Sequence, residues 1–164
     1  MEERKSFFKT RNQLQFQEKL QDKMEREGLD ALVITTPENI MYATGFVPWS
    51  YLGRSCGSSV AVVLRSGRVA LVCNQFEQRS AEQQTKGDVD VYSFPIAMYI
   101  EDYYNEEESQ KPPAPDPYKT FRIAFDLIKS KVENPKVGVE MYEIPCTIFP
   151  FFVENFGEEN LVNL

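Results

Sequence analysis

Apolar residues recur every four positions near the start of the chain and then give way to short unbroken apolar runs. The spacing predicts a helix over residues 10–27 that ends at Gly28. Its apolar stripe comprises Phe16, Leu20 and Met24. The β-branched run DALVITT, residues 30–36, predicts a buried strand. A short helix is expected over residues 37–45, because a proline opens that stretch and a glycine closes it.

The middle of the chain alternates between strand and helix patterns. Residues 46–58 form a loop rich in glycine and aromatic residues. Residues 59–73 contain two β-rich runs joined by the turn at 65–67, which predicts a hairpin. A polar helix is expected over residues 75–85 and a further strand over residues 88–94.

An acidic run and a proline-rich run occupy residues 101–117, which predicts a long surface loop. Asp116 is a candidate N-cap of the next helix, and Pro117 fits its first helical position. The apolar positions of that helix step by three and four, as an amphipathic helix requires. They are Tyr118, Phe121, Phe125, Ile128 and Val132.

The end of the chain predicts a buried strand over residues 136–140, a helix over 145–156 and an edge strand over 160–164. Pro150 falls inside this last helix, so we expect a kink there. Strands that alternate with helices, apart from one hairpin, predict an α/β fold of three layers. We expect a mixed sheet of about six strands with helices on both faces, as a single domain over residues 1–164.

The composition narrows the classes of function. A net charge of −7 argues against nucleic acid as a partner, and the charged N-terminus is no secretory signal. No apolar run approaches the length of a membrane span. The three cysteines form no CxxC pair, so we expect reduced thiols in a cytoplasmic protein. The chain has no histidine, which removes the commonest general base and transition-metal ligand.

The stretch GRSCG, residues 53–57, fits the pattern of a serine nucleophile elbow. Such an elbow needs a helix after the serine and a base beside it, whereas Ser55 is followed by a strand pattern in a chain without histidine. The same reasoning argues against Cys56 as a nucleophile and predicts a small buried side chain there. A phosphate-binding loop would also need a helix directly after the glycines. The pattern therefore predicts no catalytic residue.

The same loop offers candidate binding groups. Arg54 presents a planar cation suited to a carboxylate, and Trp49, Tyr51 and Leu52 offer an apolar wall beside it. Two interpretations remain open. These side chains contact a substrate or partner, or the aromatic residues cap the core while Arg54 is solvated.

The segment EREGLDALVITTPENIMYATGF resembles the opening of the N-terminal domain of the creatinase/prolidase family, and KVGVE and ENLVNL resemble its end. Members are two-domain metallohydrolases: Xaa-Pro dipeptidases, Xaa-Pro aminopeptidases and creatinase. The resemblance implies a ribonuclease H-like N-terminal domain without cofactor or metal. It also implies a separate C-terminal catalytic domain that binds a divalent metal (Mn, Co or Zn) in the peptidases and none if the protein is creatinase-like.

The resemblance further implies a role for the loop. In this family the N-terminal domain helps to form a homodimer and overhangs the partner subunit's active site. Gly53 and Arg54 match a creatinase segment whose arginine meets the substrate carboxylate, while Leu52 replaces a phenylalanine there. We therefore expect a non-catalytic domain for dimerisation and substrate gating in an enzyme of the Xaa-Pro dipeptidase kind, without nucleic acid or membrane as a partner. A creatinase-like amidinohydrolase and a stand-alone binding module are the alternatives.

A third hypothesis follows from the ribonuclease H-like fold, because such nucleases bind Mg²⁺ through acidic residues. The carboxylates near predicted strand ends are Asp30, Asp88, Asp90 and Glu140. They lack a recognisable metal-ligand spacing, and the interpretation that we favour for them is ordinary surface groups.

Overall fold

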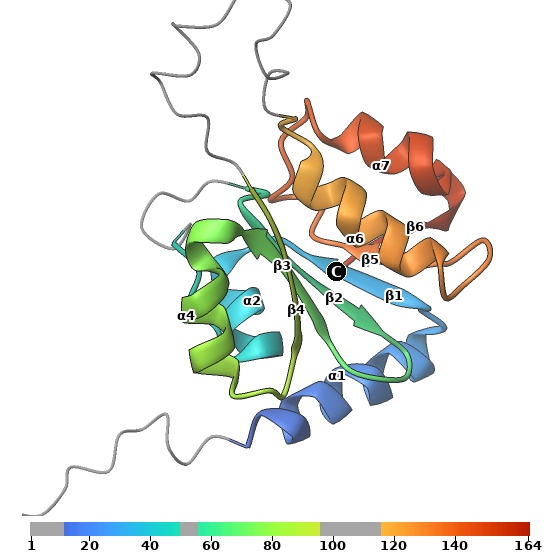
Figure 1. The fold of residues 1–164 in the computed structure, drawn as a ribbon. Coiled ribbons are helices and arrows are strands. Elements are labelled where there is room, and N and C mark those ends of the chain that lie inside the picture. Colours follow the sequence, from blue (N-terminus) through green and yellow to red (C-terminus); the bar gives the residue numbers. More distant parts are fainter. Residues whose placement is uncertain (1–11, 50–55, 96–115) are drawn as a thin grey trace, which may run out of the picture.

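A computed structural model describes residues 12–49, 56–95 and 116–164, which form a six-stranded mixed sheet between two layers of helices (Figure 1). The strand order is β4-β3-β2-β1-β5-β6. The strands are β1 (Ala31–Ile34), β2 (Ser59–Leu64), β3 (Ala70–Asn74), β4 (Asp90–Phe94), β5 (Val137–Val139) and β6 (Leu161–Asn163). This architecture confirms the predicted fold class.

The direction of the strands gives the sheet two different edges. Strand β2 pairs antiparallel with both β1 and β3, whereas β3–β4, β1–β5 and β5–β6 pair in parallel. Five strands therefore end at one edge of the sheet, which we call the carboxyl edge, and β2 begins there. The opposite edge, where those five strands begin, is the amino edge.

Helices cover both faces of the sheet, as Figure 1 shows. One face carries α1 (Gln13–Glu27), α2 (Pro37–Thr44) and α4 (Gln75–Thr85), and the other carries α6 (Lys119–Lys129) and α7 (Phe149–Phe156). A short 3₁₀ helix, η3 (Glu158–Asn160), leads into β6. Alternate residues of β1 and β2 enter separate cores on the two faces. Because both faces are covered, these strands have the continuous apolar sequences from which they were predicted.

The core under α6 and α7 is aromatic. The ring centroid of Phe125 lies 4.8 Å from those of both Phe152 and Phe156, in edge-to-face geometry. Phe121 and Ile128 are fully buried beside them, so the predicted stripe of α6 is confirmed over its helical part. The hairpin β2–β3 and the edge strand β6 are confirmed as well.

Three helix starts differ from the predictions. Helix α1 begins at Gln13 and not at residue 10. Helix α6 begins at Lys119 with Tyr118 as its N-cap residue, because Pro117 lies in a preceding turn. Asp116 stabilises this turn instead: one carboxylate oxygen accepts from the Tyr118 backbone N–H at 2.9 Å and the other pairs with Arg122 at 2.8 Å. Helix α7 begins at Phe149, four residues later than predicted. Pro150 therefore lies in the first turn of the helix, where no intrahelical N–H bond is needed, and the predicted kink was wrong.

The buried face of α1 also differs from the apolar stripe. Gln13 and Gln17 are buried together with Met24, while Phe16 and Leu20 are only half-buried. The side-chain amides of three glutamines spaced four apart donate to backbone carbonyls of three other segments. These bonds run from Gln13 to Tyr42 (2.9 Å), from Gln17 to Asp88 (3.2 Å), and from Gln21 to Leu64 (3.0 Å) and Gly67 (2.9 Å). Hydrogen bonding makes these polar side chains tolerable at a buried face.

Candidate functional site

At the carboxyl edge, the connections that follow the neighbouring strands β1 and β5 run to opposite faces of the sheet. The chain leaves β1 into α2 on one face of the sheet, and beyond β5 it continues to α7 on the other face. Crevices at such switch points are the usual ligand sites of open α/β sheets. A cavity of about 440 Å³ opens here, lined among others by Thr35, Thr36, Cys56, Glu140 and Glu143.

Glu140 follows β5 and is the buried carboxylate of this crevice, with an exposure of 7%. It accepts five hydrogen bonds, all from the turn between β1 and α2 and the start of that helix. Its Oε2 accepts from the Thr35 backbone N–H (2.6 Å), the Thr35 hydroxyl (2.9 Å) and the Thr36 backbone N–H (2.8 Å). Its Oε1 accepts from the Thr36 hydroxyl (2.7 Å) and the Asn39 amide (2.5 Å).

The surroundings of Glu140 favour the ionised form of its carboxyl. Burial by itself would raise the pKa of this carboxyl, but the hydrogen bonds from Asn39, Thr36 and the Thr35 backbone lower it below the ordinary value. The negative charge also lies at the N-terminus of α2, where its interaction with the helix dipole is favourable. Since both oxygens are occupied, Glu140 ties α2 to the end of β5 and is poorly placed to act on a substrate.

A second buried carboxylate, Glu77 on α4, binds Trp49 in the first part of the glycine-rich loop and Ser59 directly after the loop. Its Oε1 accepts from the backbone N–H of Trp49, and its Oε2 accepts from the Ser59 hydroxyl at 2.7 Å. The Asn74 side chain adds a bond of 2.9 Å to Oε2 and caps α4 by accepting from the Glu77 backbone N–H at 3.1 Å. One buried side chain thus connects the residues that lead into and out of the loop.

Further contacts hold the two described parts of this loop, which we call its first arm (residues 46–49) and its second arm (residues 56–58). On the first arm, the Val47 backbone N–H donates to Gln84 of α4 at 3.0 Å. On the second arm, Gly57 has a positive φ of 85° and lies directly against α6. A Cβ atom there would lie 2.5 Å from Cε2 of Phe121, so only glycine fits without a shift of the ring or the backbone.

The predicted binding residues are placed as follows. Trp49 lies at the base of the loop with its side chain 76% exposed, so it does not cap the core. Tyr51, Leu52 and Arg54 lie outside the described residues. The structure therefore supports the exposed position of the indole and leaves the role of Arg54 as a prediction.

Burial disfavours the thiolate form of two cysteines near this edge. Burial raises the pKa of Cys56, and the charges of Glu140 and Glu143 raise it further, despite a hydrogen bond with Thr35. Burial, with the nearby charge of Glu77, raises the pKa of Cys73 in β3 to about 12. A thiolate is unfavourable at both positions. Cys56 is only half-buried, so the predicted buried side chain at that position was wrong.

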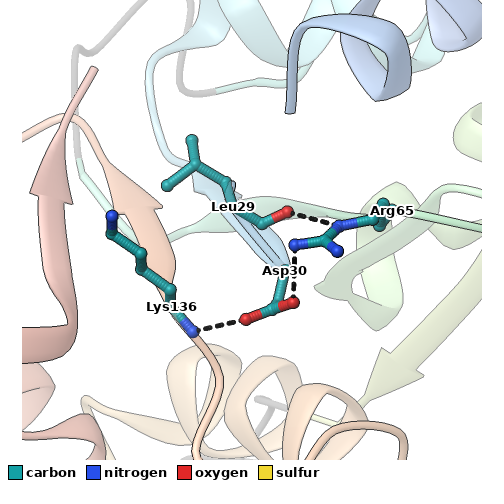
Figure 2. Close-up of polar contacts among 4 residues, drawn as sticks. All are labelled: Leu29, Asp30, Arg65 and Lys136. Atoms are coloured by element: carbon teal, nitrogen blue, oxygen red, sulfur yellow. Dashed lines mark hydrogen bonds and ion pairs between the residues drawn. The ribbon is translucent and has the colours of Figure 1, made fainter. Parts of the chain in front are cut away.

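The four acidic residues of the metal hypothesis do not converge. Asp30 precedes β1 at the amino edge, where its carboxylate pairs with Arg65 at 2.8 Å and accepts from the Lys136 backbone N–H at 2.9 Å (Figure 2). Asp88 and Asp90 lie at the start of β4, three strand spacings or about 14 Å from β1. Glu140 lies at the carboxyl edge.

Most of these carboxylates already have protein partners. Asp90 pairs with Arg68 at 3.2 Å, in addition to the contacts of Asp30 and Glu140 given above. Glu140 is buried, so our interpretation of it as an ordinary surface group was wrong. Across residues 12–49, 56–95 and 116–164 no group of three or more cysteine, aspartate or glutamate residues is arranged to hold a metal ion. The positions of these four residues do not fit the carboxylate-bound Mg²⁺ site considered as the third hypothesis.

Sequence reasoning missed Glu77, Ser59 and Asn74 as parts of the site. A local signal was present, because the sequence Asn74-Gln75-Phe76-Glu77 places a good N-cap residue three positions before an acidic residue, as in a capping box. That signal predicts the start of a helix. The bonds from Glu77 to Trp49 and Ser59 are tertiary contacts that no local pattern reveals.

The fold and the site define an α/β domain with two buried glutamates at the carboxyl edge. Glu140 holds the start of α2, and Glu77 holds residues on either side of the glycine-rich loop. A family model described as the creatinase/prolidase N-terminal domain matches residues 17–164, and the chain belongs to this family. No curated protein sequence matches the chain. Within the described ranges, no helix has the length and apolar character needed to cross a membrane.

Solved structures with the same fold include N-terminal domains and longer enzymes. The N-terminal domain of a putative metallopeptidase from Corynebacterium diphtheriae is 12% identical, with a TM-score of 0.58 over 94% of this chain and 95% of that one. The N-terminal domain of the cytoplasmic peptidase PepQ from Mycobacterium tuberculosis is 16% identical, with a TM-score of 0.61 over 92% of each chain. The Xaa-Pro dipeptidase from Bacillus anthracis is 13% identical, with a TM-score of 0.61, and the match covers 93% of this chain but only 34% of that one.

Proposed function

We propose that this chain is the non-catalytic N-terminal domain of a cytoplasmic two-domain metallohydrolase of the Xaa-Pro dipeptidase kind. In this proposal the domain takes part in a homodimer, and its loop over residues 46–58 reaches the active site in the partner's catalytic domain. The family membership supports the domain assignment. The observation that carries the loop's role is its attachment at both ends to the buried Glu77.

A positioning role fits the chemistry of the chain better than catalysis. The sequence has no histidine, and the two buried carboxylates of the carboxyl edge have their oxygens occupied by hydrogen bonds within the domain. A general base or metal ligand needs a free oxygen that can reach the substrate. The reacting groups and the divalent metal would then belong to the second domain.

The loop offers groups that can recognise a substrate with a carboxylate. The Trp49 side chain is exposed while its backbone is held in place, which makes it a rigid apolar contact. Arg54 lies between the two anchored arms in the sequence and carries a permanent positive charge. A dipeptide with a free C-terminal carboxylate matches this pair of groups.

The test is Arg54→Ala in the full-length protein, assayed by hydrolysis of Xaa-Pro dipeptides. Loss of a charged hydrogen bond to the substrate should lower kcat/KM by roughly 10- to 100-fold with an unchanged melting temperature. Arg68→Ala is the matched control, because Arg68 is a half-exposed arginine at the amino edge and should leave kcat/KM unaltered. An unaltered kcat/KM in Arg54→Ala would remove Arg54 from the site, and hydrolysis of creatine instead of dipeptides would favour the creatinase-like alternative.

Action on a partner subunit has its own test. The full-length protein should sediment as a dimer at the concentrations used for the assay. A mixture of Arg54→Ala subunits with subunits inactivated in the catalytic domain should regain activity, because a mixed dimer holds one intact loop opposite one intact catalytic domain. A fully active monomer would contradict the proposed gating across the dimer.

A further inference from the structure

We propose that Glu77 is a positioning residue that holds the backbone of Trp49 to the start of β2 at Ser59 and thereby sets how the exposed Trp49 indole is presented. The part of this inference that concerns the substrate rests on the function proposed above. Glu77 is only 6% exposed, and its two oxygens are divided between the two ends of the loop. The same carboxylate therefore fixes the separation of residues ten positions apart in the sequence.

Capping of α4 does not explain this carboxylate. The backbone N–H of Glu77 is already satisfied by the Asn74 side chain at 3.1 Å, which is the usual N-cap bond. The Glu77 carboxylate accepts one bond from the side chain of this N-cap residue, at 2.9 Å, and two bonds from outside the cap, from the Trp49 backbone and the Ser59 hydroxyl. Two of the three hydrogen bonds to this carboxylate therefore hold residues on either side of the loop, and one belongs to the cap of the helix.

The contrast at Trp49 supports a role in presentation. Its side chain is 76% exposed, whereas its backbone N–H is held by a buried charged group. Phe76, which directly precedes Glu77 in α4, is 74% exposed as well. Exposed aromatic residues on a fixed backbone lose little conformational freedom when they bind, so anchoring by Glu77 favours contact with a second surface.

Alternative anchors would not replace Glu77. Gln84 holds Val47 at 3.0 Å, but this bond concerns the first arm of the loop only. The close approach of Gly57 to Phe121 concerns the second arm only. Among the bonds of the described residues, those of Glu77 join the two arms, so its loss should free them relative to each other.

The structural arm of the test is hydrogen exchange of the 164-residue chain carrying Glu77→Gln, with Glu82→Gln as the matched control. Glu82 lies on the same helix but is exposed, so both variants remove one negative charge from α4. We expect the Trp49 amide to exchange roughly tenfold faster in Glu77→Gln, because a charge-assisted bond becomes neutral or is lost. Unchanged exchange at Trp49 would overturn the anchoring role.

The functional arm is a double-mutant cycle in the full-length protein. Glu77→Gln should lower kcat/KM by roughly tenfold when Trp49 is present and have little effect in the Trp49→Ala background, since Glu77 acts by holding the Trp49 backbone. Equal losses in both backgrounds would indicate general damage to the fold and overturn the positioning role. If Arg54→Ala alone changes nothing, the proposed function fails, and the exchange experiment still decides whether Glu77 anchors the loop.

A second variant guards against loss of folding. Ser59→Ala removes one donor to Glu77 but keeps the carboxylate, its bond to Trp49 and a small buried side chain at the start of β2. We expect a severalfold loss of kcat/KM when Trp49 is present and little loss in the Trp49→Ala background, with a melting temperature close to that of the wild type. A variant that folds normally and retains full kcat/KM would contradict the requirement for a joined loop base.

Discussion

Glu140 gives the sharpest test of how the carboxyl edge is held together. Glu140→Gln preserves the shape of the side chain and removes its charge. Its amide oxygen can still accept from the backbone N–H groups of Thr35 and Thr36, and the hydroxyls and the Asn39 amide can reorient toward the new NH₂ group. The loss is therefore mainly the charge assistance of two backbone hydrogen bonds.

The expected magnitude follows from these two bonds. A hydrogen bond to a charged group contributes about 1 kcal/mol more than a neutral one, so the substitution should lower the free energy of unfolding by about 2 kcal/mol. Glu140→Ala leaves both backbone donors without a protein acceptor and should cost about 3–5 kcal/mol. With a urea slope of about 2 kcal/mol/M, Glu140→Gln moves the midpoint down by about 1 M.

The dependence on pH distinguishes charge from packing. The pKa of Glu140 is lowered in the folded state, so its contribution is fully present above the unfolded-state pKa of about 4.3 and is lost as the pH falls through the folded-state value. The difference between wild type and Glu140→Gln should therefore be largest at pH 7 and shrink below about pH 4.

The assay is urea unfolding followed by far-UV circular dichroism at pH 7 and at acid pH. Glu143→Gln is the control, because Glu143 lies in the same crevice but is exposed, and its free energy of unfolding should stay within about 0.5 kcal/mol of the wild type. Equal midpoints for Glu140→Gln and wild type at pH 7 would refute the argument. So would a difference that persists undiminished in acid.

Two further predictions concern the close packing of Gly57 and the different exposure of the three cysteines. Gly57→Ala should destabilise the domain by about 2 kcal/mol, because the new Cβ meets the Phe121 ring at 2.5 Å and φ is positive. Gly67→Ala, also at positive φ but with no atom within 4 Å of the Cβ, should cost only about 1 kcal/mol in the same urea assay; equal losses would contradict the steric part. In a thiol titration of the native 164-residue chain with an aromatic disulfide near pH 8, the exposed Cys146 should react first, since burial raises the pKa of Cys56 and of the third cysteine. Rapid reaction of all three thiols would contradict the buried environment.

Much of the fold was predictable because it depends on local patterns. The continuous apolar sequences of β1 and β2 reflect helices on both faces of the sheet, and such runs are the usual mark of buried strands. Helix α6 follows its apolar period because Phe121, Phe125 and Ile128 all enter one core. The resemblance in the PENI segment indicated the family independently of these patterns.

The buried face of α1 could not be predicted in the same way. Periodicity counts hydrophobic side chains, whereas Gln13 and Gln17 are buried because their amides reach carbonyl groups 29 and 71 residues away. Whether a glutamine is buried depends on where those carbonyls lie after folding. The predicted start of α6 failed for a related reason, since Asp116 forms a turn with Tyr118 and Arg122 before the helix begins.

The candidate site was predictable only in part. Glu140 was recognised as an acidic residue at a strand end, but its donors Thr35 and Thr36 lie more than 100 residues earlier in the chain. Glu77 carried the sequence signal of a helix start, yet its bonds to both arms of the loop arise from tertiary structure. A sequence shows which residues can ionise, whereas their partners determine whether they catalyse, bind or position.

Two buried carboxylates at one edge of a sheet would ordinarily suggest acid–base chemistry. Here the hydrogen bonds assign them to different structural elements: Glu140 holds the start of α2, and Glu77 holds the base of the loop. The hydrogen bonds to Glu140 lower its pKa, so this carboxylate is a weak base. Under the proposed function, the reactive groups would come from the second domain, and this pair of carboxylates would serve only to hold the structure around the loop.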